Sequence, residues 1–68
     1  MEPHIMNPIK VGTEKFVILD AKWNSERQMA LVSYIDEKGA KFETEAFGMT
    51  PSETRQAVAD DATHRLAR

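Results

Sequence analysis

Apolar residues, many of them β-branched or aromatic, fill two segments of this chain that four polar residues separate. Such composition favours strands over helices. We therefore predict strands over residues 15–23 and 28–36, joined by a polar loop at residues 24–27. Polar and apolar positions then alternate with a period of two over residues 41–47, which indicates a third strand.

A capping box predicts where a helix begins after these strands. In the run Gly-Met-Thr-Pro-Ser-Glu at residues 48–53, Thr50 can accept a hydrogen bond from the N–H of Glu53, and Glu53 can reach back to the N–H of Thr50. Pro51 suits the first helical position, so we predict a helix over residues 51–67. Opposite charges spaced four residues apart predict two ion pairs in it: Asp60 with His64 and Asp61 with Arg65.

The segment before the first strand contains Pro3, Pro8 and a Gly12-Thr13 pair, which disfavour a helix. We predict an extended N-terminal arm over residues 1–14 and a single β-β-β-α domain over residues 15–68. The predicted fold class is α+β: a three-stranded antiparallel sheet with one C-terminal helix packed on one face.

The loops set the expected pairing of the strands. A type I turn closed by Gly39 would pair Asp36 with Ala40, and the polar loop would pair Trp23 with Gln28. One apolar face of the sheet then comprises Val17, Leu19, Ala21, Trp23, Ala30, Val32, Tyr34, Phe42 and Ala46. We expect the helix to cover this face with Val58, Ala62 and Leu66, which recur at helical spacing.

The opposite face of this sheet carries more apolar side chains than a solvated face should, and they form the candidate protein interface: Phe16, Ile18, Met29, Leu31 and Ile35. Burying one such side chain contributes roughly 1.5–3 kcal/mol, so a small domain gains much from covering them. A second copy of the chain, a different protein, or the N-terminal arm could provide the cover, the arm through its apolar residues Ile5, Met6, Ile9 and Val11. We expect a homodimer.

Composition narrows the class of protein. The chain has 68 residues and a formal net charge of −2. It has no cysteine, and this absence excludes disulfide scaffolds, thiolate zinc sites and cysteine nucleophiles. No apolar run approaches the ~20 residues of a membrane span. Residues 1–4 lack the basic and apolar regions of a secretory signal, so we expect a cytoplasmic protein.

Candidate catalytic chemistry is sparse. The two histidines, His4 and His64, lie far apart in the sequence, and no nucleophile elbow or phosphate-binding glycine loop is present. The cluster of Asp60, Asp61 and His64 offers two ligands on one helix face, and a metal site would need a third ligand from elsewhere. We therefore predict no catalytic residues, no metal, no cofactor and no enzymatic activity.

A nucleic-acid-binding regulator is the alternative function, because a three-stranded sheet can enter a major groove or offer aromatic side chains for stacking. The cations that would carry it lie on or near the strands and loops: Lys22, Arg27, Lys38 and Lys41. Acidic residues interleave with these cations and cancel most of the field, and affinity for phosphates scales with the charges neutralised. We therefore favour a small accessory protein that binds other proteins, of a type frequent in phages and mobile elements.

The stretch Phe-Gly-Met-Thr-Pro-Ser-Glu-Thr-Arg-Gln-Ala at residues 47–57 is similar to a junction in double-stranded-RNA-binding-like domains and in HicB-type antitoxin domains. Both end a three-stranded sheet in a Gly-x-Thr/Ser step that opens a helix. The leading helix and the second-helix lysines of the first family are missing, and so is the Pro-Asp-x-Pro-Gly run of the second. We assign the chain to neither family.

Overall fold

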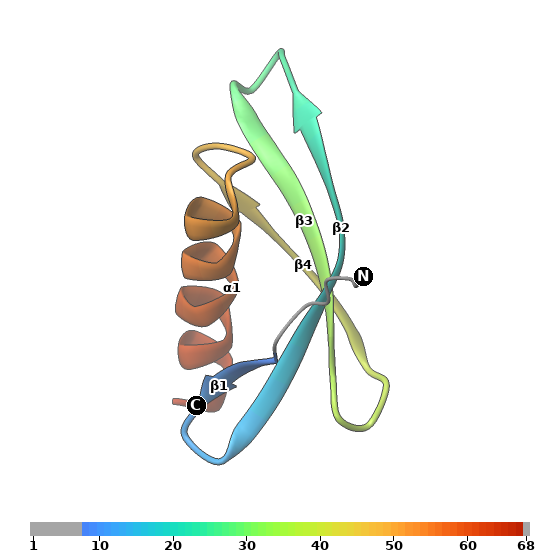
Figure 1. Ribbon diagram of the computed structural model, residues 1–68, viewed down its shortest axis with the longest axis vertical. Coiled ribbons are helices and arrows are strands. Elements are labelled where there is room, and N and C mark those ends of the chain that lie inside the picture. The colour runs from blue at the N-terminus through green and yellow to red at the C-terminus, as the bar shows by residue number, and fades with distance from the viewer. Residues whose placement is uncertain (1–7, 68) are drawn as a thin grey trace, which may run out of the picture.

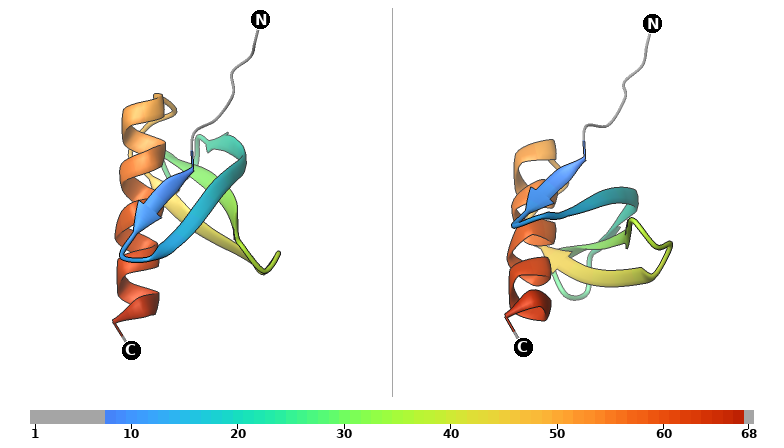
Figure 2. Two further views of the ribbon diagram at one scale, coloured as in Figure 1. Left: turned by 60° about the horizontal axis from the view of Figure 1, so that its bottom comes forward. Right: turned by 90° about the horizontal axis from the view of Figure 1, so that it is seen from below.

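The computed structural model describes residues 8–67 and shows an α+β fold. One antiparallel sheet, with strands in the order β1-β2-β3-β4, carries a single C-terminal helix on one face (Figures 1 and 2). The elements are β1 (Ile9–Val11), β2 (Glu14–Asn24), β3 (Met29–Asp36), β4 (Lys41–Ala46) and α1 (Pro51–Leu66). We call the side of the sheet that α1 covers the helix face and the other side the back face.

The sheet of the described chain has four strands rather than the three predicted, because residues 9–11 of the expected arm form β1. Gly12 has a φ of +63°, and with Thr13 it makes the two-residue turn between β1 and β2. Ile9 pairs with Phe16 and is buried on the helix face. Ile9 and Val11 therefore do not cover the back face, and the expected cover by Ile5 and Met6 lies outside the described residues.

The predicted pairing of β3 with β4 is confirmed, including Asp36 with Ala40 and Tyr34 with Phe42. Local turn chemistry explains it. The Asp36 carboxylate accepts hydrogen bonds from the N–H groups of Lys38 and Ala40, both at 2.9 Å. Gly39 takes a φ of +86°, a left-handed conformation that glycine adopts without strain.

The predicted pairing of β2 with β3 is wrong, by two residues over 20–24 and by one residue over 16–18. Trp23 pairs with Ala30 rather than with Gln28, so that the loop is residues 25–28. The Asn24 side chain stabilises this loop by accepting hydrogen bonds from the N–H groups of Glu26 and Arg27 at 3.0 and 3.2 Å. The polar residues predicted that a loop lies here, but the predicted first residue of the loop is wrong, because Asn24 is still part of β2.

A β-bulge between Ile18 and Asp20 changes which side chains of β2 face α1. An extra residue in one strand shifts the alternation of its side chains relative to the partner strand. Phe16 is therefore 4% exposed within the core, and Ile18 packs against that core, so the placement of both on the uncovered face is wrong. Leu19, expected on the helix face, is 51% exposed. Val17 pairs with Ile35 and lies on the back face.

The helix begins as its capping box predicts. Thr50 is the N-cap residue, its hydroxyl oxygen accepts from the N–H of Glu53 at 3.2 Å, and Pro51 is the first helical residue. The Glu53 carboxylate accepts from the Thr50 hydroxyl at 2.8 Å rather than from the Thr50 N–H as predicted. Val58 and Ala62 are buried as expected, but Leu66 is exposed because the last turn of α1 extends beyond the sheet (Figure 2).

Tyr34 lies at the centre of the core on β3 and is fully buried. Its ring meets Phe16 edge-on with centroids 5.7 Å apart, and Phe42 with centroids 5.4 Å apart. The buried hydrophobic residues are Ile9, Phe16, Ala30, Val32, Tyr34, Ala46, Val58 and Ala62. Three of these eight residues are alanines, so the core of the described chain is thin.

Candidate protein-binding surfaces

The back face is the surface on which the sequence predicted an interface. Met29, Leu31 and Ile35 lie there as expected, and Val17 joins them in place of Phe16 and Ile18. Leu31 is 38% exposed, and the others are partly exposed. Polar side chains flank this stripe at register positions on β2 and β4: Asp20, Lys22, Lys41, Glu43 and Glu45.

An ion pair closes one end of the back face. Arg27, in the loop after β2, donates two hydrogen bonds from its guanidinium to the Glu45 carboxylate on β4, at 2.5 and 2.8 Å. These hydrogen bonds raise the pKa of Arg27 and lower that of Glu45. Leu31 on β3 pairs with Glu45, so the bidentate contact lies beside the apolar stripe.

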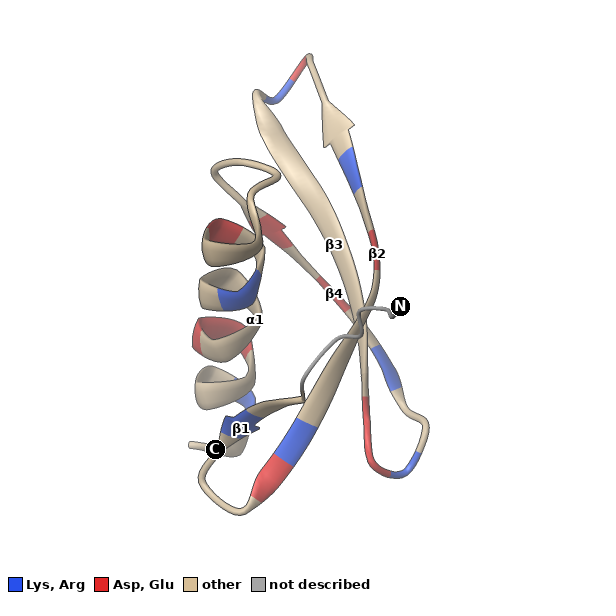
Figure 3. Ribbon diagram, viewed as in Figure 1, with Lys and Arg blue, Asp and Glu red and all other residues tan. Residues whose placement is uncertain are grey.

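The cations proposed for nucleic-acid binding are not gathered into one patch (Figure 3). Lys22 and Arg27 lie toward one end of the β2–β3 hairpin, whereas Lys38 and Lys41 lie at the opposite end of the sheet. Arg27 is bound to Glu45. The arrangement therefore offers no continuous basic stripe along the described strands.

A polar network beside the core joins α1 to the helix face of the sheet. The Tyr34 hydroxyl donates to the Asp61 carboxylate at 2.5 Å, and Arg65 Nε donates to Asp61 at 3.1 Å and to the Tyr34 oxygen at 3.3 Å. The Arg65 guanidinium also lies 4.4 Å from the centroid of the Phe42 ring. The predicted Asp61–Arg65 pair is thus confirmed.

Burial, and then the hydrogen bond to Asp61, raise the pKa of Tyr34 to about 12. Both effects favour the neutral phenol, because burial penalises the phenolate and the carboxylate needs the phenol as a donor. The hydrogen bonds that Arg65 donates to Tyr34 and to Asp61 raise the pKa of Arg65. At neutral pH the network therefore holds an uncharged Tyr34 between one anion and one cation.

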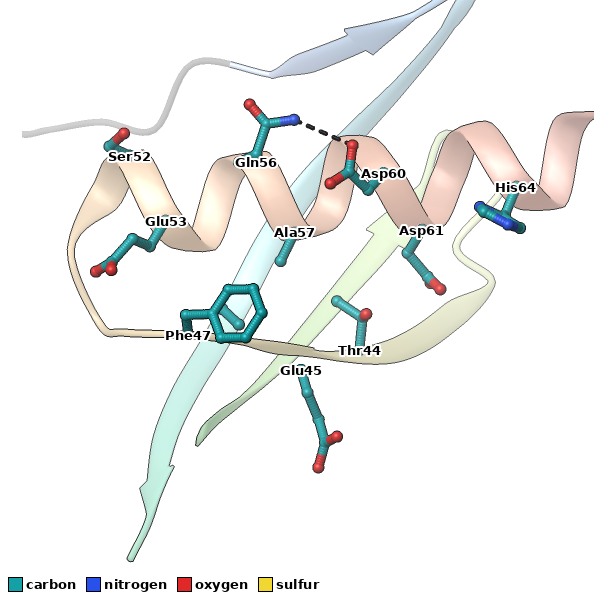
Figure 4. Close-up of a pocket in the computed structure, with 11 residues that line it drawn as sticks. Thr44, Glu45, Phe47, Ser52, Glu53, Gln56, Ala57, Asp60, Asp61 and His64 are labelled. Atoms are coloured by element: carbon teal, nitrogen blue, oxygen red, sulfur yellow. Dashed lines mark hydrogen bonds between the residues drawn. The ribbon is translucent and has the colours of Figure 1, made fainter. Parts of the chain in front are cut away.

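A groove of about 460 Å³ lies between β4 and α1 (Figure 4). It is lined on the strand side by Thr44, Glu45, Ala46 and Phe47, and on the helix side by Ser52, Glu53, Gln56, Ala57, Asp60, Asp61 and His64. The Phe47 ring is 84% exposed and lies beside Ala57, and the Glu45 carboxylate points away from the helix. No Lys or Arg is among these lining residues.

Asp61 points toward β4 from the helix wall of the groove, Glu53 points toward the turn that precedes α1, and Asp60 lies on the outer rim of the groove (Figure 4). Glu53 accepts from the Thr50 hydroxyl at 2.8 Å, and Asp60 accepts from the Gln56 amide at 3.0 Å rather than pairing with His64 as predicted. Because both donors are uncharged, neither hydrogen bond compensates the negative charge of its carboxylate.

Sequence reasoning missed this groove. The polar alternation of β4 and the acidic residues of α1 were both visible, but their relative placement depends on how the helix crosses the sheet. The groove brings Asp60, Asp61 and His64 together with β4, yet no group of three metal-binding side chains is found among residues 8–67. The helix in this part of the chain is too short and too polar to cross a membrane.

Comparisons of the chain with protein-family models, with curated proteins and with solved structures find no match.

Proposed function

We propose that this chain is a small, non-enzymatic accessory protein that acts by binding proteins, and that it forms a homodimer through its back face. The observation that supports the proposal is the stripe of Val17, Met29, Leu31 and Ile35, which no described element covers. From the sequence we also keep two further proposals, a cytoplasmic location and a phage or mobile-element origin.

The thin core gives the physical reason for a dimer. Domains of this size bury only about 60% of their unfolded surface and are marginally stable. Here two of the buried strand residues, Ala30 and Ala46, contribute little apolar area. Burying Leu31 and Ile35 against a second copy would add apolar area that the helix cannot supply. A two-fold contact needs only one patch, since each copy presents the same surface.

Sedimentation of Leu31→Glu against the unmodified protein, each at several concentrations, tests this proposal. We expect the unmodified chain to sediment as a dimer and Leu31→Glu as a monomer, because a carboxylate at the centre of an apolar contact would lose its hydration there.

Leu66→Glu is the matched control, since Leu66 is an exposed leucine at the far end of α1. It should sediment as the unmodified protein does. A monomeric unmodified protein at all concentrations, or a dimer that Leu31→Glu leaves intact, would refute the back-face contact.

A further inference from the structure

One edge of the sheet is open for pairing along the groove. The N–H of Asp36 donates to the carbonyl of Ala40, so this pair of β3 and β4 is hydrogen-bonded. Hydrogen-bonded and non-hydrogen-bonded pairs alternate along antiparallel strands. Glu43 and Glu45 fall at non-hydrogen-bonded positions of the register, so their backbone N–H and C=O groups face away from β3. Because β4 is the last strand of the sheet formed by residues 8–67, these groups have no strand of that part of the chain beside them.

The groove places this edge beside α1. Residues 44–47 of β4 and its extension form one wall, and Gln56, Ala57 and Asp60 of the helix contribute to the other (Figure 4). An extended segment that lies along β4 would therefore bind the edge through its backbone and meet the helix through alternate side chains. Phe47, 84% exposed at this groove, offers an aromatic contact to an apolar side chain of such a segment.

The negative charge of the groove indicates which kind of peptide segment fits it. The helix side of the groove carries the carboxylates of Glu53, Asp60 and Asp61, and the lining contains no Lys or Arg. Arg65 offsets Asp61, but the hydrogen bonds to Glu53 and Asp60 come from uncharged groups. Lysine or arginine side chains fit this wall, whereas acidic side chains would be repelled.

We propose that the groove between β4 and α1 binds an extended, basic peptide segment of a partner protein, which adds to β4 as a further strand. Its basic side chains lie toward Glu53 and Asp60, and an apolar side chain packs on Phe47. This inference rests on the proposed role in protein binding and names the partner's chemistry, but it does not depend on the back-face dimer.

Selection of short random peptides displayed on phage against the full chain tests the proposal. We expect enriched sequences with Lys or Arg at alternate positions, and we expect the corresponding synthetic peptides to bind more tightly than peptides with Glu at those positions. Amide chemical shifts should change along residues 43–47 and along the groove side of α1. An absence of enriched peptides, a preference for acidic ones, or shift changes confined to the back face would overturn it.

Glu45→Pro and Glu45→Ala form the matched pair of variants. Both remove the contact with Arg27, but only proline also removes the outward N–H of residue 45, and the ladder with β3 does not use that group. We expect Glu45→Pro to weaken peptide binding about tenfold relative to Glu45→Ala. Equal binding by the two variants would contradict strand addition. Circular dichroism checks that both variants fold. If the proline variant unfolds, the test of strand addition is whether peptide binding changes the amide shifts of residues 43–47 in the unmodified protein.

The double variant Glu53→Gln with Asp60→Asn tests the charge. It keeps the hydrogen-bonding shapes and removes two negative charges, so basic peptides should bind several-fold more weakly and with less dependence on salt. Unchanged affinity would refute the charge selection. Leu31→Glu should bind the peptides as the unmodified protein does, so that failure of the dimer and failure of the groove are separate outcomes.

Discussion

The Tyr34 hydroxyl on β3 donates a hydrogen bond to the Asp61 carboxylate on α1, at 2.5 Å, and this contact joins the two layers of the fold. Arg65 completes it by donating to both partners. The phenol ring is buried among apolar side chains, whereas its hydroxyl reaches the polar margin of the helix. The most buried aromatic side chain of the core is therefore also the one that orients the helix through polar groups.

Tyr34 should titrate near pH 12, well above the ordinary tyrosine value of 10. Tyr34 is the only tyrosine of the chain, so tyrosinate absorbance reports this residue alone. Between pH 10 and 12 the unfolded chain has lost the phenolic proton while the folded chain keeps it, so the free energy of unfolding falls as pH rises through this window. The loss should amount to about 2 kcal/mol.

Tyr34→Phe is the control for this titration. It removes the Asp61 hydrogen bond and should cost about 1 kcal/mol at neutral pH. Its stability should then fall less between pH 10 and 12 than that of the unmodified protein, as measured by urea unfolding at each pH. An ordinary tyrosine titration in the folded protein would contradict the buried hydrogen bond.

Deletion of Leu19 should preserve the fold. Ile18 and Asp20 pair with Tyr34 and Ser33, which are adjacent on β3, so removing the extra residue restores a regular alternation on β2. The edge-on contact of Phe16 with Tyr34 should persist as nuclear Overhauser effects between the two rings. Leu19→Ala is the control, because it removes the leucine side chain but keeps the extra residue in β2. Loss of the ring contact in the deletion variant would contradict the regular register expected for the shortened strand.

Thr50→Ala should destabilise the protein by about 1 kcal/mol, because the N–H of Glu53 loses its acceptor at the first turn of the helix. Ser52→Ala is a suitable control, since Ser52 is exposed inside the same turn and does not cap it. Urea unfolding of both variants measures the difference. Equal losses from the two substitutions would contradict the capping role of Thr50.

Gly48→Ala should disturb the same turn through Glu53. A Cβ atom at residue 48 would overlap Glu53 Oε1, so the carboxylate must move and give up its hydrogen bond from Thr50. The side chain is flexible, and the expected loss is about 0.5 kcal/mol. In a Glu53→Ala background the loss should vanish, and a double-mutant cycle measures this coupling. An undiminished loss there would place its cause elsewhere.

The sequence by itself determined the features that depend on neighbouring residues. The Asp36 carboxylate and Gly39 fix the turn, and the turn fixes the pairing of β3 with β4. Thr50 and Pro51 fix the start of the helix. In each case the chemistry that selects the conformation lies within a few residues of it, so local reasoning is sufficient.

Only the tertiary structure decided three features: which side chains of β2 face the helix, the pairing of residues 9–11 with β2 as a strand, and the groove. Residues 16–19 are all apolar, so their pattern cannot say which side chains point inward. The bulge at Leu19 and the burial of Phe16 beside Ile9 and Tyr34 settle this by packing. The groove exists because α1 crosses the sheet beside β4, and that crossing minimises the free energy of the whole core rather than of any one segment.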